Sequence, residues 1–188
     1  MVKVAFICED DAGKKIIDSP GFLQLLQENN LELVLPVYNA RGKGNLTEEN
    51  VRGLVDSSLE NGATYVFLIT DMDLDACFTL TKQKLIQDSR CIIIVCKKAV
   101  EAWFLGDTQA LCALLNRNAY FEYPEDPVVP FDTINQLYKE AFNGRGISKP
   151  ILPIKMLGRG FSIVNAANHP NCPSALYFLE KLRSLKTT

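Results

Sequence analysis

Carboxylate side chains recur directly after three apolar, strand-like runs of the sequence, and they are the residues best suited to chemistry. If these runs are parallel neighbours in one sheet, their carboxyl ends share an edge, which is where open α/β sheets bind ligands. Carboxylates gathered there would repel each other and raise one another's pKa unless a cation neutralised them. The acids that follow the first, third and fourth apolar runs are Glu9, Asp10 and Asp11, then Asp71, Asp73 and Asp75, and finally Glu101.

An acidic cluster without histidine or cysteine partners favours a hard cation with oxygen ligands, so we expect Mg²⁺ or Mn²⁺. The sequence has 1 histidine, His169, which we expect in a surface loop, and 6 cysteines, none of them in a C-x-x-C pair. No zinc set is therefore predicted. We expect the cysteines to be reduced core thiols, as in a cytoplasmic protein.

Helix capping is the simpler interpretation of the same acids, because carboxylates stabilise helix N-termini. Asp75 fits this interpretation, and so does either Asp10 or Asp11 at the start of the first helix. Acids after a single strand would not be evidence for a site, but acids after three strands at one edge favour a metal or phosphate site. A calcium-binding EF-hand loop is excluded, because Ala76 and Lys82 stand where such a loop needs glycine and glutamate;.

Basic residues flank the same predicted edge. Arg41 and Lys43 lie in a glycine-rich loop after the second apolar run, and Lys97 and Lys98 follow the fourth. These four are candidate phosphate-binding residues, since glycines let a backbone approach a phosphate closely. Ordinary solvated surface residues are an equally good interpretation. The net charge is −2, so any contact with nucleic acid must use a local basic patch;.

Alternating strand and helix patterns indicate how these residues are positioned. A helix is predicted from Pro20, another from Thr47 to about Asn61, one of about a dozen residues after the acidic turn, and one over 99–115;. The alternation predicts an open, doubly wound, mainly parallel α/β sheet of the Rossmann-like kind. Its simplest strand order is second, first, third, fourth. The predicted strands are 2–8, 31–37, 63–70 and 90–96.

Residues 1–116 are predicted to form this α/β core and residues 117–188 a helical C-terminal extension packed on it, within a single domain overall. Hydrophobic residues make up 47% and charged residues 22% of the chain, which are ordinary globular values that exclude a coiled coil or a disordered tail;. No apolar run reaches the roughly 18 residues of a membrane span, so no membrane contact is expected. The single tryptophan, Trp103, is expected to anchor the core;.

The sequence resembles the Toprim domain of topoisomerases, primases and OLD-type nucleases, in which a Glu ends the first strand and a D-x-D motif the third. Here these residues are Glu9, Asp71 and Asp73. More specifically, VEAWFLGD at 100–107 is similar to an E-x-W-[FL]-L segment of a family of uncharacterised bacterial Toprim-like proteins. The C-terminal segment of that family is matched by Lys155, Phe161 and NCPSALYFLEKL at 171–182.

This resemblance implies a magnesium-dependent phosphodiesterase, a nuclease acting on DNA or RNA in a bacterial defence or toxin-like system. It implies that Glu9 is a general acid/base or a metal ligand, that Asp71 and Asp73 hold Mg²⁺, and that Glu101 completes the metal site. One departure is that Asp10 stands where the usual first Toprim motif has glycine.

Two other function classes remain open. A receiver-like phosphoacceptor module would use Asp10, Asp11, Asp71 and Lys97, although Lys97 follows the fourth strand instead of a fifth and the helical tail is unlike a receiver. A non-catalytic Toprim-like subunit that binds a partner protein is the third alternative.

Overall fold

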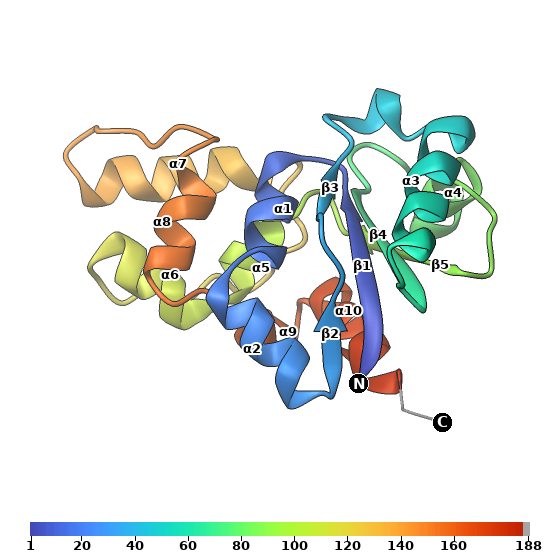
Figure 1. The fold of residues 1–188 in the computed structure, drawn as a ribbon. Coiled ribbons are helices and arrows are strands. Elements are labelled where there is room, and N and C mark those ends of the chain that lie inside the picture. The colour runs from blue at the N-terminus through green and yellow to red at the C-terminus, as the bar shows by residue number, and fades with distance from the viewer. Residues whose placement is uncertain (186–188) are drawn as a thin grey trace.

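A computed structural model describes residues 1–185, so the last three residues of the expected extension, 186–188, lie outside the described residues. A parallel sheet of 5 strands forms its centre, in the order β2-β1-β4-β5 with β3 also beside β1 (Figure 1). The structure confirms the predicted α/β class and the predicted strand order. The strands are β1 (Val2–Cys8), β2 (Leu31–Leu33), β3 (Tyr38–Asn39), β4 (Tyr65–Asp71) and β5 (Cys91–Cys96).

Helices cover both faces of the sheet, as a doubly wound fold requires. One face carries α3 (Glu48–Glu60), and the other carries the first helices and the C-terminal ones (Figure 1). The remaining helices are α1 (Asp11–Ile17), α2 (Pro20–Glu28), the 3₁₀ helix η1 (Lys43–Asn45), α4 (Phe78–Gln83), α5 (Glu101–Gly106), α6 (Thr108–Leu115), α7 (Pro130–Ala141), α8 (Leu152–Gly158), α9 (Ile163–Ala167) and α10 (Pro173–Ser184).

The central strands are almost wholly apolar because both of their faces are buried. Side chains alternate between the faces, so Phe6 and Phe67 enter the larger hydrophobic cluster while Ile7 and Leu68 enter the smaller one under α3;. Phe178 of α10 packs edge-on against Phe6, with ring centroids 6.4 Å apart. The α/β core and the C-terminal helices therefore share one hydrophobic cluster.

The second predicted strand is divided in the structure. β2 ends at Leu33 and β3 begins at Tyr38, within the segment predicted as a loop, and both pair with β1. Pro36, which follows a cis peptide bond, separates them. Proline has no N–H to donate to a strand ladder, so the pairing stops on one side of it and resumes on the other.

Two predicted helices are shorter than expected. α4 has 6 residues instead of about a dozen, and a turn in which Asp88 accepts a hydrogen bond from the N–H of Arg90 leads into β5;. The helix predicted over 99–115 is divided into α5 and α6 at Asp107. The side chain of Asp107 accepts a hydrogen bond from the N–H of Ala110 at 3.0 Å, so it begins a new helix instead of continuing the first;.

The prediction for Trp103 is confirmed. His169 lies in the connection between α9 and α10, as predicted for a loop residue, but it is buried instead of lying at the surface. Trp103 is 1% exposed and stacks on Phe178. His169 is only 7% exposed, because its ring stacks on Tyr120 with centroids 5.2 Å apart and its Nδ1 accepts a hydrogen bond from the N–H of Asn171. No helix among residues 1–185 is long and apolar enough to cross a membrane.

Candidate functional site

The parallel register brings the ends of the central strands to one edge. Asp71, the last residue of β4, pairs with Cys96, the last residue of β5. On the other side of β4, the N–H of Glu9 donates to the carbonyl of Ile69 at 2.9 Å, which continues the pairing of β1 with β4 by one residue. Glu9, Asp71 and the segment after Cys96 therefore meet at the carboxyl edge, as their positions after the strands predict.

Glu9 is held by groups at the end of β4. Its Oε2 accepts a hydrogen bond from Thr70 Oγ1 at 2.6 Å and another from the N–H of Asp71 at 3.0 Å. Thr70 is 1% exposed, so the contact is protected from water. No hydrogen bond from residues 1–185 reaches Oε1 of Glu9, which leaves that oxygen available to a ligand.

Asp71 is buried and connects β4 to the start of α5. It is 9% exposed, and its Oδ1 accepts a hydrogen bond from the N–H of Val100 at 2.9 Å. Burial, together with the negative charges of Glu101 and Glu9, raises the pKa of Asp71 well above its usual range;. A cation near Asp71 would offset this penalty on its negative charge.

Glu101, the first residue of α5, is more deeply buried. It is 1% exposed, and neither of its carboxylate oxygens receives a hydrogen bond from residues 1–185. Burial raises the pKa of Glu101, and the nearby ammonium of Lys149 opposes the shift. Lys149 Nζ lies 3.5 Å from Glu101 Oε1, which is the separation of a loose ion pair;.

The carboxylate of Asp73 forms an ion pair with Lys43. Asp73 has a positive φ of 52°, and Lys43 Nζ donates to its Oδ2 at 2.9 Å. Lys43 also donates to the carbonyls of Asp71 and Met72 at 3.0 and 3.2 Å. Lys43, one of the candidate phosphate-binding residues, is thus engaged in holding the turn after β4.

The helix-capping interpretation is confirmed for Asp10 and wrong for Asp75. Asp10 caps α1 by accepting a hydrogen bond from the N–H of Gly13 at 2.9 Å. Asp75 caps no backbone group: its carboxylate accepts hydrogen bonds from Lys84 Nζ and Thr81 Oγ1 instead. The Lys84 contact lowers the pKa of Asp75 to about 2.

The other three candidate phosphate-binding residues lie near the same edge in different environments. Arg41 is exposed, and its guanidinium forms no ion pair within residues 1–185. Lys97 forms an ion pair with Asp126 at 3.4 Å. The carbonyl of Lys98 accepts a hydrogen bond from the N–H of Asp73 at 2.8 Å, which joins the turns after β4 and β5.

The donor chemistry of this edge fits a hard cation, although the carboxylates do not converge on one point. Within the described part of the chain, no three His, Cys, Asp or Glu side chains are grouped so that they could hold a metal ion. Both oxygens of Glu101 are nevertheless buried and without hydrogen bonds within residues 1–185, and a cation would satisfy them;. Mg²⁺ and Mn²⁺ are the cations that such an oxygen-only donor set would favour.

Lys149 is the residue of this site that sequence reasoning missed. It lies 48 positions after Glu101 in a connection between two helices, next to Pro150, and no local pattern marks it. No local pattern in the sequence marks Glu125 either, although it is a buried acid. It is 1% exposed, and its Oε1 accepts hydrogen bonds from the N–H and the hydroxyl of Ser174 at 2.8 and 2.6 Å.

The two segments that carry the resemblance pack against each other. Trp103 Nε1 of VEAWFLGD donates to Ser174 Oγ of the C-terminal segment at 2.8 Å. Gly106 lies so close to Cys172 that a Cβ at Gly106 would approach the Cys172 sulfur to 3.0 Å. These contacts hold α5, and with it Glu101, against the start of α10.

Replacing Asp71 with asparagine is expected to raise the free energy of unfolding at pH 7 and to flatten its pH dependence. Because burial raises the pKa of Asp71 above its unfolded value, stability is highest below the unfolded pKa of about 4 and is lost as the pH rises toward the folded pKa;. Each pKa unit of difference costs about 1.4 kcal/mol once the group is ionised. Asparagine retains the oxygen that accepts from Val100 and carries no charge.

Urea unfolding in EDTA between pH 4 and 8 measures this effect, with the exposed Asp132→Asn variant as the matched control. A lower stability of Asp71→Asn at pH 7, or an unchanged slope, would contradict the assigned burial penalty.

No protein-family model, curated protein or solved structure matches this chain. The carboxylates at the edge of the sheet and their surroundings are therefore the observations that bear on its chemistry.

Proposed function

We propose that this protein is a Toprim-like, magnesium-dependent phosphodiesterase that cleaves nucleic acid, with Glu9, Asp71 and Glu101 at the centre of its site. The observation that carries the proposal is the pair of buried carboxylates with raised pKa, Asp71 and Glu101, beside Glu9 at the carboxyl edge of the sheet. Burying carboxylates is costly, and groups with perturbed pKa concentrate at functional sites.

Asp71 and Glu101 would hold the cation, and Asp73 would join them on release from Lys43. When bound, Mg²⁺ or Mn²⁺ supplies Lewis acidity and lowers the pKa of a bound water. Glu9 Oε1 is the atom suited to accept a proton, since Thr70 and the Asp71 N–H fix the carboxylate through the other oxygen;.

The proposed substrate is DNA or RNA, whose phosphates would contact Arg41, Lys97 and Lys98 beside the carboxylates. Arg41 is the strongest candidate for a phosphate contact, because its exposed guanidinium forms no ion pair within the described residues. Lys43 would contribute indirectly, through Asp73. We propose the cytoplasm as the compartment, because all 6 cysteines are free thiols;.

The receiver-like alternative is disfavoured by the surroundings of Asp71. The Oδ1 of Asp71, which would have to accept the phosphoryl group, already accepts a hydrogen bond from the Val100 N–H. Lys97, the lysine of that alternative, pairs with Asp126. The partner-binding alternative has one supporting feature, an apolar hollow between α4, β5 and α10 that is lined by Phe78, Val95, Pro173 and Tyr177 among others.

Calorimetric titration with Mn²⁺ and a cleavage screen test the proposal together. Wild type is expected to bind Mn²⁺ and to cut at least one of single- and double-stranded DNA and RNA, while an Asp71→Asn, Asp73→Asn double variant does neither. Asp132→Asn, an exposed substitution outside the site, should behave as wild type. Equal heats for wild type and the double variant, with no cleavage of any substrate, would favour the partner-binding alternative.

A further inference from the structure

We propose that Lys149 is a resident counter-ion of the buried carboxylates and that a divalent cation displaces it on binding. This inference rests on the proposed function in one respect, namely that the carboxylates take up a metal. It adds that one lysine of the C-terminal extension sets the affinity of these carboxylates for the metal.

The ion pair joins a buried acid to a lysine that reaches it from solvent. Lys149 lies in the connection between α7 and α8, and its Nζ is 3.5 Å from Glu101 Oε1. The side chain of Glu101 is 1% exposed, whereas that of Lys149 is 54% exposed. Displacing the ammonium would therefore return it to water without opening the core.

Lys149 is the cation that pairs with the buried carboxylate of Glu101. Within residues 1–185, no other lysine or arginine forms an ion pair with the carboxylate of Glu9, Asp71 or Glu101. Lys149 thus supplies the positive charge that a metal would otherwise supply.

The contact between Lys149 and Glu101 is weak enough for a divalent cation to replace it. Charge-assisted hydrogen bonds between ammonium and carboxylate groups span about 2.7–2.9 Å, so 3.5 Å is a long separation;. Both oxygens of Glu101 remain without a hydrogen bond from residues 1–185. A divalent cation, which binds carboxylate oxygens at about 2.1 Å, would interact with them more strongly.

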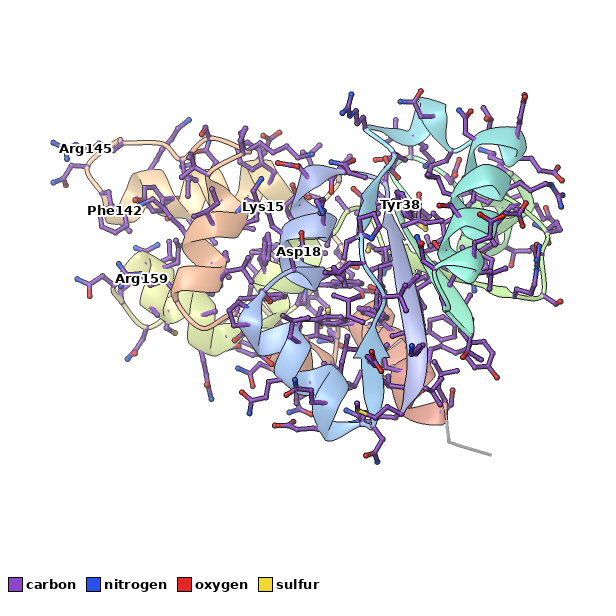
Figure 2. The ribbon with its side chains drawn as sticks, in the orientation of Figure 1. Lys15, Asp18, Tyr38, Phe142, Arg145 and Arg159 are labelled. Atoms are coloured by element: carbon purple, nitrogen blue, oxygen red, sulfur yellow. The ribbon has the colours of Figure 1, made fainter. Side chains whose placement is uncertain are left out.

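The connection that carries Lys149 is anchored by Ile147 before it and by a turn in which the Ser148 carbonyl accepts a hydrogen bond from the N–H of Leu152 at 3.1 Å. Ile147 is 6% exposed, and its N–H donates to Asn135 Oδ1 at 2.9 Å. Between Ile147 and α8 the chain is exposed over residues 148–151. Figure 2 shows Phe142 and Arg145 at the outer tip of the same connection, away from the sheet. Lys149 can leave Glu101 while Ile147 keeps its anchor.

A double-variant cycle tests the counter-ion role without any metal. In EDTA, Lys149→Met is expected to lower Tm by about 2–4 °C, and the same substitution in a Glu101→Gln background to change Tm by much less. Lys3→Met, at an exposed lysine outside the site, should leave Tm unchanged. An equal loss of Tm in both backgrounds would overturn the counter-ion role.

Mn²⁺ titration then tests the exchange. Lys149→Met and Lys149→Gln are expected to bind Mn²⁺ roughly tenfold more tightly than wild type, because a competing unit charge has been removed, and Lys149→Arg should stay near wild type. Unchanged or weaker binding by Lys149→Met, beside normal binding by wild type, overturns the exchange and leaves the proposed function standing. Absence of Mn²⁺ binding by wild type and all three variants overturns both.

Discussion

Replacing Glu9 with glutamine is expected to lower metal-dependent cleavage of nucleic acid by about 100-fold or more while leaving the fold intact. The amide oxygen of glutamine can still accept the hydrogen bonds from Thr70 Oγ1 and the Asp71 N–H, so the contact between β1 and β4 persists. What is lost is the negative charge and the ability of the second oxygen to accept a proton. The measurement is the initial rate of cleavage with Mn²⁺, at substrate concentrations that separate kcat from KM.

Glu60→Gln, at an exposed glutamate at the end of α3, is the matched control and should cleave as wild type does. Circular dichroism and the urea midpoint of each variant establish that the fold is retained. If Glu9→Gln cuts as fast as wild type, Glu9 only holds the turn after β4, and the catalytic role assigned to it is wrong.

Truncating Trp103 to alanine is expected to produce the largest loss of stability among the substitutions considered, about 3–5 kcal/mol. The indole is 1% exposed, stacks on Phe178 with ring centroids 5.5 Å apart, and donates to Ser174 Oγ at 2.8 Å. Its removal leaves a cavity between α5 and α10 and loosens Ser174, the partner of the buried Glu125. Urea unfolding followed by far-ultraviolet circular dichroism measures the loss.

Trp103→Phe separates packing from hydrogen bonding, because phenylalanine keeps an aromatic ring against Phe178 and has no N–H. It should lose less stability than Trp103→Ala. Tyr123→Ala, which truncates an aromatic residue that is 50% exposed, should cost under about 0.5 kcal/mol;. A loss for Trp103→Ala as small as that for Tyr123→Ala would show that α5 is held to α10 by other contacts.

The strands and the edge they form follow from patterns that lie within a few residues. The apolar runs that became β1, β4 and β5 are buried on both faces, and burial selects such runs wherever the chain carries them;. Because parallel strands end at one edge, the positions of Glu9 and Asp71 were predictable from the sequence. Trp103 was predictable in the same way, since a large apolar ring has few places outside a core.

Boundaries within these elements were less predictable, because single side chains decide them. Asp107 divides the helix over 99–115 by accepting hydrogen bonds from the N–H of Ala110 and from that of Ser162, and Ser162 is distant in the sequence. His169 is buried because Tyr120, 49 positions earlier, stacks on it. Neither contact produces a periodic pattern of residue types in the amino-acid sequence.

The amino-acid sequence by itself determined the α/β class, the order of the strands and the edge at which the acids gather, because burial and backbone geometry act on neighbouring residues. Only the tertiary structure decided which charges meet there. Lys43 pairs with Asp73, and Lys149 pairs with Glu101. Such pairs join residues far apart in the chain, so they depend on the path of the connecting loops. Charge interacts through space, and the loops set the distances over which it acts.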